Sequence, residues 1–468
     1  MTGTPTGPQL ATRVVSRNPS DPGDVVADVA STGIWRTVEA ADRARDAHRA
    51  WYAGGAAARS AALTSAAHAV EQAAAELADL AVREVGKPLS EARAEVARTV
   101  AILRYYSQLP YDATGSVHEP AGGTGFLLTR RRPRGVAGLI TPWNFPYAIP
   151  VWKAAPALAA GNSVVLKPAP EATACALRLA ELLQQTLPDG VFTVIPGGAP
   201  EGNALVSAVD AVSFTGSTVT GSAVVRTATA RGIPVQAEMG GLNAALVLPD
   251  ADPARAAADI AAAIAGYAGQ KCTATSRVVA VGPALGPLRD ALADALRAIP
   301  AADPAQPATV CGPLISEQAR RKVLDAACDV PLLAGGKPAE GPGWYTAPTL
   351  AEQVPSGHQL LREEVFGPIA VLLHAADLDQ AVRMTNAVPY GLVTSVHTGD
   401  LDAALHGLDG LDTGMVRLNA PSTGVDFHLP FGGTKSSSHG PREQGRSALD
   451  FYTSSRTYSL HRATMSAT

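Results

Sequence analysis

A thiol and a carboxylate occur in two short runs near the middle of the chain. Cys272 lies in the run Gly-Gln-Lys-Cys-Thr-Ala-Thr, Glu238 begins the run Glu-Met-Gly-Gly, and thirty-three residues separate them. A thiolate attacks carbonyl carbons, and a nearby carboxylate can take a proton from water. The pair could therefore capture an acyl group on sulfur and release it by hydrolysis. Alone it is weak evidence, because a cysteine beside a lysine is more often an ordinary half-buried thiol.

Composition permits an enzyme and excludes several other classes of protein. The chain has 468 residues, 46% of them hydrophobic, which predicts two or three domains with an ample core. Its formal charge of −4 gives no footprint for nucleic acid, and the basic run at residues 130–134 lies between apolar, strand-like segments. An uninterrupted apolar stretch of about 18 residues is absent from the sequence. We therefore expect neither nucleic acid nor a membrane as a partner.

The cysteines indicate a reducing compartment. They are dispersed, without metal-ligand spacing or the pattern of a disulfide-rich protein, so we expect no metal site and a free thiol at position 272. The first 18 residues contain no apolar signal segment. These features predict a cytoplasmic protein whose cysteines are Cys175, Cys272, Cys311 and Cys328.

The elements that must position these groups alternate between helix and strand. Apolar and alanine positions recur at helical spacing early in the chain, with a break at residues 86–88. Short β-rich runs then alternate with helical patterns, which is typical of βαβ units and a mostly parallel sheet. A second alternation runs from about residue 244 to about residue 425. The expected helices are residues 38–83, 89–106 and 173–185, and the expected strands are residues 125–129, 135–140, 163–166 and 191–195.

Two motifs follow predicted strands at positions where a loop could enter a cleft. Residues 142–146, Pro-Trp-Asn-Phe-Pro, could aim a side-chain amide at a substrate, or form only a rigid turn. Residues 214–221, Phe-Thr-Gly-Ser-Thr-Val-Thr-Gly, could bring backbone close to a pyrophosphate at a helix N-terminus. Gly-Ser-Thr loops are also common structural turns, so neither motif is specific alone.

Two later motifs lie at residues 363–368 and 430–436. Together with the motifs described above, they form a series in a recognisable order. The chain resembles the aldehyde dehydrogenase superfamily from about residue 18 to about residue 458. This resemblance implies an α/β fold with a Rossmann-like cofactor domain, an α/β catalytic domain and a small β oligomerisation element. The implied domains are residues 1–114 and 134–238 for nucleotide binding, residues 239–447 for catalysis, and residues 115–133 and 448–468 for oligomerisation.

The resemblance also implies catalytic roles. Cys272 matches the nucleophile that forms a thiohemiacetal with the aldehyde, and the Asn144 amide with the Cys272 backbone N–H would hold the oxyanion, at roughly 3 kcal/mol per donor. Glu238 matches the general base that hydrolyses the thioester. Members that pass the acyl group to coenzyme A lack this carboxylate, so a free acid is the expected product. Lys153 and Glu443 match residues that relay protons from the base.

Cofactor positions follow from the same matches, and they include a departure. Many relatives that prefer NAD have a glutamate three residues after Lys167, where it repels a 2′-phosphate; this chain has Pro170 there and Glu171 one place later. NAD or NADP therefore remains open as the cofactor. The candidate cofactor-binding residues are Ile140, Pro142, Trp143, Lys167, Pro170, Glu171, Phe214, Gly216, Ser217, Gly221, Gly240, Glu364 and Phe366.

Candidate substrate residues combine cations with aromatic walls, which favours a short aldehyde bearing an anionic group. We predict that Arg98 or Lys271 binds this anion, although Arg98 could be a helix-surface residue. Lys271 could instead lower the pKa of the neighbouring thiol, or point to solvent. The substrate-binding candidates are Arg98, Phe145, Trp152, Lys271, Thr273, Val425 and Phe431.

The subgroup is indicated by residues 269–275, 424–428 and 440–446, which look most like 2-oxoglutarate semialdehyde (2,5-dioxopentanoate) dehydrogenases. Three departures from the wider family leave a specialised aromatic, amino or phosphonate aldehyde open as an alternative. Ser438 stands where most members have Gly, Pro441 is an extra residue, and Leu242 replaces a frequent Lys.

Two rival functions and an assembly state complete the expectations. The rivals are a non-catalytic binding module and a thiol esterase that needs no cofactor. Exposed strand edges in the hairpin near residues 115–133 and in the C-terminal strand predict a homodimer or homotetramer.

Overall fold

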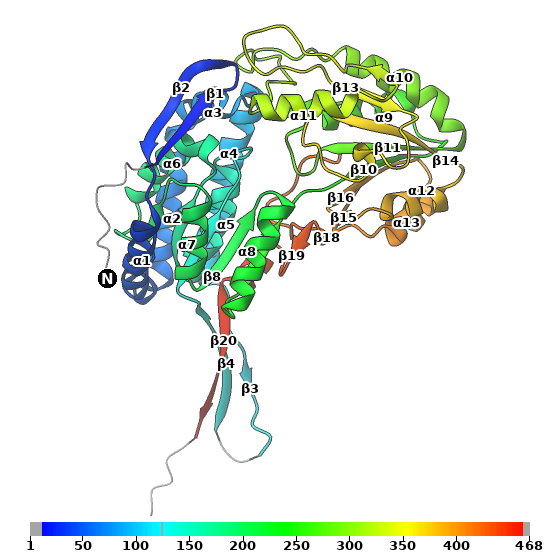
Figure 1. Ribbon diagram of the computed structural model, residues 1–468. Helices are drawn as coiled ribbons and strands as arrows, with labels where there is room; N and C mark the ends of the chain where they lie inside the picture. The colour runs from blue at the N-terminus through cyan, green and yellow to red at the C-terminus, as the bar shows by residue number, and fades with distance from the viewer. Residues whose placement is uncertain (1–11, 123–124, 462–468) are drawn as a thin grey trace, which may run out of the picture.

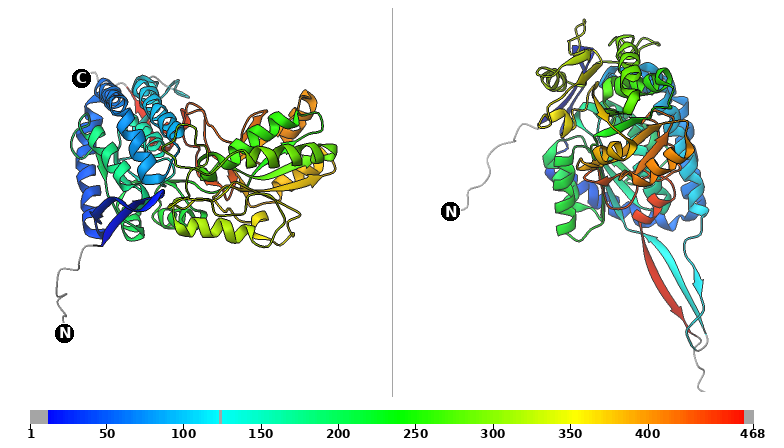
Figure 2. Two further views of the ribbon diagram at one scale, coloured as in Figure 1. Left: turned by 90° about the horizontal axis from the view of Figure 1, so that it is seen from above. Right: turned by 90° about the vertical axis from the view of Figure 1, so that its right-hand side faces the viewer.

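The computed structural model describes residues 12–122 and 125–461. They form two lobes and an arm that extends away from both (Figures 1 and 2). Each lobe is built around its own sheet, so the fold is α/β, as predicted from the sequence. In this part of the chain, no helix is both long enough and apolar enough to cross a membrane.

The first lobe contains a six-stranded sheet in the order β19-β9-β8-β5-β6-β7. All pairs are parallel except β19 with β9. From β5 the chain moves outward to β6 and β7, and then crosses back to β8 on the other side of β5. This reversal creates a switch point at the carboxyl ends of β5 and β8, where ligands of such sheets bind. The strands are β5 (Val136–Ile140), β6 (Ser163–Lys167), β7 (Phe192–Val194), β8 (Ala211–Thr215), β9 (Val235–Glu238) and β19 (Ser438–His439).

Helices cover both faces of this sheet, and its central strands are therefore buried on both sides. The predicted helical region at residues 38–83 is three helices, interrupted at Gly54 and Ala73, and the predicted break at residues 86–88 is confirmed by Gly86 in a left-handed C-cap. The helices are α1 (Ile34–Ala53), α2 (Gly55–Gln72), α3 (Ala74–Val85), α4 (Leu89–Gln108), α5 (Ala148–Ala160), α6 (Thr173–Gln184), α7 (Ala199–Ala208) and α8 (Thr218–Ala230). An N-terminal hairpin that the sequence did not predict, β1 (Arg13–Asn18) with β2 (Asp21–Ala30), packs beside α3 and α6.

The second lobe contains a seven-stranded sheet in the order β12-β13-β14-β11-β10-β16-β17. The strands are β10 (Asn243–Val247), β11 (Thr275–Val281), β12 (Leu332–Ala334), β13 (Thr349–Glu352), β14 (Ile369–Ala375), β16 (Val393–His397) and β17 (Met415–Leu418). The helices of this lobe are α9 (Pro253–Ala265), α10 (Leu285–Arg297), α11 (Glu317–Ala327), α12 (Leu378–Asn386) and α13 (Leu401–Gly410). A small ladder pairs β15 (Tyr390–Gly391) with β18 (Thr434–Lys435).

The chain returns to the first lobe near residue 447, the predicted end of the catalytic domain, and the division at residues 238 and 447 remains a prediction. β19 lies within the segment 239–447 but pairs with β9 of the first lobe, placing Ser438 opposite Glu238. The short helix α14 (Ser447–Phe451) then packs against α5 of the same lobe. The segment that returns to the first lobe therefore lies beside Glu238, at the end of β9.

The arm is a three-stranded antiparallel sheet in the order β20-β4-β3. Its strands are β3 (Val117–His118), β4 (Phe126–Pro133) and β20 (Thr453–Leu460). The basic run at residues 130–132 lies in β4 and pairs with β20. Val117, Phe126 and Leu460 are exposed on the arm despite being large and apolar.

Candidate active site

The loop that carries Cys272 begins with an unusual backbone. After α9, Tyr267, Ala268 and Gly269 all have left-handed conformations, with φ of 54°, 52° and 66°. This conformation costs roughly 1–2 kcal/mol for a residue with a side chain. Tyr267 offsets that cost by fixing the loop at two points: its hydroxyl donates to the Val85 carbonyl at 2.8 Å, and its N–H donates to Val310 at 2.9 Å. The path of the chain toward Cys272 is thus set by contacts outside the loop.

Two asparagine amides hold the segment around Cys272. Asn243, at the start of β10, donates from Nδ2 to the carbonyls of Cys272 and Ala274, each at 2.8 Å. Asn144 donates from Nδ2 to the Gln270 carbonyl at 2.8 Å. An amide NH2 carries two donors, and no second bond from this group occurs among the described residues. Asn144 is therefore anchored near Cys272, and its second N–H makes no hydrogen bond within the described residues.

The Cys272 thiol is free and half-buried. Burial, with the negative charges of Glu364 and Glu238, raises the pKa of this thiol to about 12. Lys271 does not oppose this effect, because its ammonium donates to the Glu91 carboxylate of α4 at 2.7 Å. The alternative in which Lys271 lowers the thiol pKa is therefore unsupported, as is a fully solvated side chain, since Lys271 is only 12% exposed.

Glu238 lies buried at the end of β9. The Ser438 hydroxyl donates to its Oε2 at 2.5 Å. Burial and the neighbouring Glu443 raise the pKa of Glu238 well above its ordinary value, while Ser438, Lys153 and Arg442 act in the opposite direction. A carboxylate with a raised pKa accepts a proton readily, as a general base requires.

Lys153 and Glu443 form a fully buried ion pair next to Glu238. Glu443 also accepts hydrogen bonds from the Trp152 indole at 2.7 Å and from the Ser213 hydroxyl at 3.2 Å. Lys153 donates to the Ser213 hydroxyl at 2.8 Å, and burial lowers the pKa of Lys153. These contacts bring the predicted relay residues together with the predicted base.

The switch point of the first sheet has the features of a dinucleotide site. The hydroxyls of Thr141 and Thr215, which follow or end β5 and β8, are buried without a hydrogen-bond partner among the described residues. Ser217 caps α8, so the N–H groups of its first turn face the same edge. Two glycines allow the backbone to pack closely beside this edge. A Cβ at Gly216 would lie 2.7 Å from the Phe214 ring, and one at Gly221 would lie 2.6 Å from the Met239 sulfur. The orphaned hydroxyls and the glycine cradle fit a bound dinucleotide.

The residues around Lys167 show how the adenosine end could be held. Lys167 is buried at the end of β6 and donates to the carbonyls of Pro168 at 2.8 Å and Gly197 at 3.1 Å. Burial lowers the pKa of Lys167 to about 8. Pro170 begins a short 3₁₀ turn and Glu171 is exposed, so the position three residues after Lys167 carries no carboxylate. Ile140 pairs with Lys167 across β5 and β6, and both side chains lie near Gly202.

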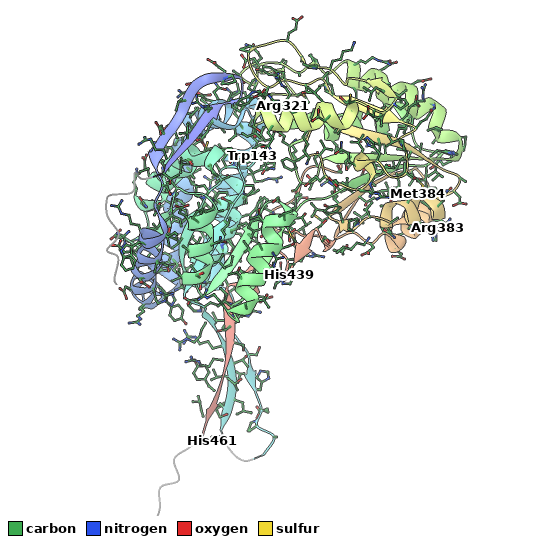
Figure 3. All side chains as sticks on the ribbon, viewed as in Figure 1. Trp143, Arg321, Arg383, Met384, His439 and His461 are labelled. Carbon is green, nitrogen blue, oxygen red and sulfur yellow. The ribbon has the colours of Figure 1, made fainter. Side chains whose placement is uncertain are left out.

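The residues predicted to hold the nicotinamide lie where the two lobes meet. Trp143 lies on the side of the first lobe that faces the second (Figure 3), and its ring meets Phe366 edge-to-face at 5.9 Å. Glu364 accepts from the Gly241 N–H at 3.1 Å and lies so close to Gly240 that a Cβ there would clash with it. Burial raises the pKa of Glu364 to about 7. Pro142 is half-buried in the loop that carries Trp143.

The structure brings some predicted substrate residues to the catalytic groups and separates others. Trp152 and Phe431 are buried, their ring centroids are 5.6 Å apart, and both adjoin Glu443. Thr273 is buried directly after Cys272. Phe145 lies beneath the Lys87 ammonium, which is 3.7 Å from its ring centroid.

Arg98 and Val425 lie farther out, without a hydrogen bond to the Cys272 loop among the described residues. Arg98 is half-buried on α4, where Asp426 and Glu95 are its nearest charges. Val425 lines a cavity of about 370 Å³ beside β17. Ser422 also lines this cavity, and its hydroxyl donates to the Thr273 carbonyl.

Sequence reasoning missed several residues that position the site. Glu95 accepts from the backbone N–H groups of Tyr147 and Ala148 at 2.9 and 3.0 Å, and its ion pair with Lys87 is fully buried. It therefore fixes the start of α5, which follows Asn144 and carries Lys153. The break at residues 86–88 contained Lys87, but only its burial distinguishes it from a surface lysine. Asn243 gave no signal beyond its place just before the second alternation, which begins at about residue 244.

Comparison with known proteins agrees with this geometry. Residues 7–458 match the aldehyde dehydrogenase family. The chain is 37% identical to the alpha-ketoglutaric semialdehyde dehydrogenase of Bacillus subtilis, over 96% of this chain and 95% of the relative. It is 38% identical to the alpha-ketoglutarate semialdehyde dehydrogenase of Haloferax volcanii, over 94% of each chain.

Among solved structures, an NAD-dependent aldehyde dehydrogenase from Sinorhizobium meliloti superposes with a TM-score of 0.92 at 32% identity. The match covers 98% of this chain and 93% of the other. The predicted family is thus confirmed over nearly the whole length. The chain belongs to the aldehyde dehydrogenase family, and it is an oxidoreductase that uses a nicotinamide cofactor, NAD or NADP.

Proposed function

We propose that this enzyme oxidises a short acidic aldehyde to its carboxylic acid through a thioester on Cys272, which Glu238 hydrolyses. The observation that carries this proposal is the buried set of Glu238, Lys153 and Glu443 beside the Cys272 loop. A cofactor-dependent enzyme that releases a free acid needs both a nucleophile and a base of this kind. A non-catalytic binding module has no use for the buried carboxylates.

In the first half of the reaction, the Cys272 sulfur attacks the aldehyde carbon and forms a thiohemiacetal. Because the thiol pKa is raised, the S–H bond breaks as the new C–S bond forms, and its proton passes to solvent water. Asn144 Nδ2 and the Cys272 N–H stabilise the oxyanion, each worth roughly 3 kcal/mol. The nicotinamide cofactor, when bound, accepts the hydride, and the carbon on sulfur becomes a thioester.

In the second half, Glu238 takes a proton from water and the resulting hydroxide attacks the thioester. The C–S bond breaks and the acid leaves. Glu443 and Lys153 adjoin Glu238 and can carry the proton onward, because their ion pair includes a buried lysine with a lowered pKa. Trp152 and Phe431 enclose these groups and limit the access of other water.

The acidic character of the substrate rests on Arg98. Its half-buried guanidinium makes no hydrogen bond or ion pair among the described residues, so it is a cation that lacks a direct partner. An arginine guanidinium can bind a carboxylate with two parallel hydrogen bonds. Two relatives act on alpha-ketoglutarate semialdehyde, as their names state, and this substrate carries such a group. Lys271 is the weaker candidate, because it is already paired with Glu91.

A substrate panel tests the proposal. Acidic, neutral, aromatic, amino and phosphonate aldehydes would be compared with both cofactors by the absorbance of the reduced nicotinamide. We expect the highest kcat/KM for an acidic aldehyde, an increase in its KM of about tenfold or more in Arg98→Ala, and no reduction of cofactor by Cys272→Ala. Arg93→Ala, which removes an exposed arginine from the same helix, is the matched control.

The outcomes separate the alternatives. Equal kcat/KM for neutral and acidic aldehydes, or an unchanged KM in both Arg98→Ala and Lys271→Ala, would contradict the acidic substrate. Best activity with an aromatic, amino or phosphonate aldehyde would indicate a specialised pathway. Ester cleavage without any cofactor-dependent oxidation would indicate a thiol esterase.

We further propose a relaxed choice between NAD and NADP, a cytoplasmic location, and a homodimer or homotetramer. The absence of a carboxylate at Pro170 supports the relaxed cofactor choice, and the four free cysteines support a cytoplasmic location. The third is supported by the exposed Val117 and Phe126 of the arm and by the open outer edges of β3, β20 and β17. Light scattering during size-exclusion chromatography would give the subunit number, and a monomer would contradict the third proposal.

A further inference from the structure

Ser438 contacts the general base directly. β19 pairs antiparallel with β9 so that Ser438 stands opposite Glu238. Its hydroxyl donates to Glu238 Oε2 at 2.5 Å, and the same Oγ accepts from the Gly433 N–H at 2.6 Å. His439, labelled in Figure 3, marks where this short strand lies between the two lobes. The mechanism described above gives Ser438 no role.

The two hydrogen bonds of Ser438 fix the direction of its proton. A serine hydroxyl has one proton to donate, and its lone pairs accept. Since the Gly433 N–H occupies a lone pair, the hydroxyl proton points at the carboxylate. The length of 2.5 Å is that of a charge-assisted O–H···O⁻ bond. Glu238 Oε2 is thereby engaged, while Oε1 lies over Gly432, where a Cβ would be only 2.7 Å away.

We propose that Ser438 is a positioning residue that holds Glu238 in its ionised form and in one orientation, so that Oε1 can take the proton from the hydrolytic water. This inference rests on the proposed function. It concerns only the second half-reaction: a water proton passes to Oε1, the water oxygen bonds to the thioester carbon, and the C–S bond breaks with its electron pair returning to Cys272.

The charges around Glu238 explain why a neutral donor matters there. Burial and the Glu443 carboxylate disfavour the ionised form of Glu238 and raise its pKa. Lys153 is committed to Glu443, and the Arg442 guanidinium donates to the Gly433 carbonyl. Ser438 is the group that donates a hydrogen bond to Glu238 itself. Without that bond the carboxylate would be ionised only at higher pH.

The test compares Ser438→Ala with Ser438→Thr, which keeps a hydroxyl, and with Ser436→Ala, which removes an exposed serine two residues away. Three quantities would be followed across pH with the best aldehyde: the pre-steady-state formation of reduced nicotinamide, the steady-state turnover, and the acyl-enzyme trapped by acid and weighed as intact protein. The melting temperature reports whether each variant folds.

In Ser438→Ala, we expect the apparent pKa on the acid side of the pH–turnover profile to rise by about one unit, because a hydrogen bond to a charged group shifts a pKa by about this amount. At pH values below that pKa, turnover should be about tenfold slower than in the wild type. Acyl-enzyme should accumulate, while the pre-steady-state formation of reduced nicotinamide stays within about twofold of wild type. Ser438→Thr should restore the wild-type profile, and Ser436→Ala should not change it.

An unmoved acid limb in Ser438→Ala would overturn the inference, as would equal losses in both half-reactions with a lowered melting temperature. If Ser438→Ala does not fold, Ser438→Thr decides: a profile shifted despite the retained hydroxyl contradicts the inference, and a wild-type profile supports it. Failure of the wild-type enzyme to reduce cofactor with any aldehyde would instead contradict the proposed function.

Discussion

Two lysine–glutamate pairs border the site, and they differ in how firmly they are held. The side chains of Lys153 and Glu443 are 0% and 1% exposed, and further hydrogen bonds from Trp152 and Ser213 fix them. Lys271 and Glu91 are 12% and 27% exposed and make one direct bond. Removing one partner leaves a charge in an apolar interior in the first case, but a charge within reach of water in the second. The first pair is therefore fixed in one geometry, whereas the second can rearrange.

Breaking the buried pair should have the largest effect. Lys153→Met leaves Glu443 buried and unpaired, so we expect a loss of about 3–5 kcal/mol in the free energy of unfolding and of about a hundredfold or more in kcat. Denaturant titration and steady-state kinetics would measure these. The double variant Lys153→Met/Glu443→Gln should recover most of the stability but not the turnover. A single variant within about 1 kcal/mol of wild type would show that the two pairs do not differ as described.

The pH dependence of Cys272 alkylation tests whether the outer pair acts on the thiol. Because the thiol pKa is raised to about 12, the thiolate fraction, and with it the alkylation rate, should rise about tenfold per unit from about pH 7 to about pH 9. Iodoacetamide labelling followed by peptide mass spectrometry would resolve Cys272 from the exposed Cys328. We expect the same profile in Lys271→Ala. A profile shifted upward in that variant would restore the thiol-tuning alternative.

Lys167 is buried as Lys153 is, but among the described residues it donates only to carbonyls and has no carboxylate bonded to it. Pro170→Glu should place one nearby and repel the 2′-phosphate of NADP, raising the ratio of kcat/KM for NAD over NADP by about tenfold. Pro170→Gln, which adds a similar side chain without charge, is the control. A wild-type preference for NAD of more than roughly a hundredfold would already show that Pro170 does not relax selectivity.

Opening the outer pair should have the smallest effect. Glu91→Gln frees the Lys271 ammonium, so we expect the KM for an acidic aldehyde to fall about twofold to threefold at low salt, with little change at high salt, where exposed charges are screened. The free energy of unfolding should change by less than about 1 kcal/mol. An equal change in KM for neutral aldehydes would mean that Lys271 does not attract the anion.

Local signals in the sequence were sufficient for the fold and the family. The helical spacing that ends at Gly86 and the strand runs such as residues 163–166 reflect short-range chain physics, and the structure has both elements. The motif order predicted the family correctly, whereas the individual roles assigned to Asn144, Lys153 and the substrate residues remain predictions.

Contacts between distant residues could not be read from local patterns. Ser438 meets Glu238 across 200 residues, and Lys271 meets Glu91 across 180. The serine was visible only as a departure from the family, and nothing nearby in the sequence said that it would face the base. Lys87 and Asn243 are similar cases, because a buried polar residue has the same letter as an exposed one.

The left-handed turn at Tyr267 and Ala268 has a consequence for biogenesis. The Tyr267 hydroxyl is bound by Val85, at the end of a helix in the other lobe, so the turn gains its main support only after the two lobes have docked. A newly made chain in which the lobes are still apart would therefore lack the arrangement of Cys272, Asn144 and Glu238. The candidate active site would therefore form only once the two lobes have docked.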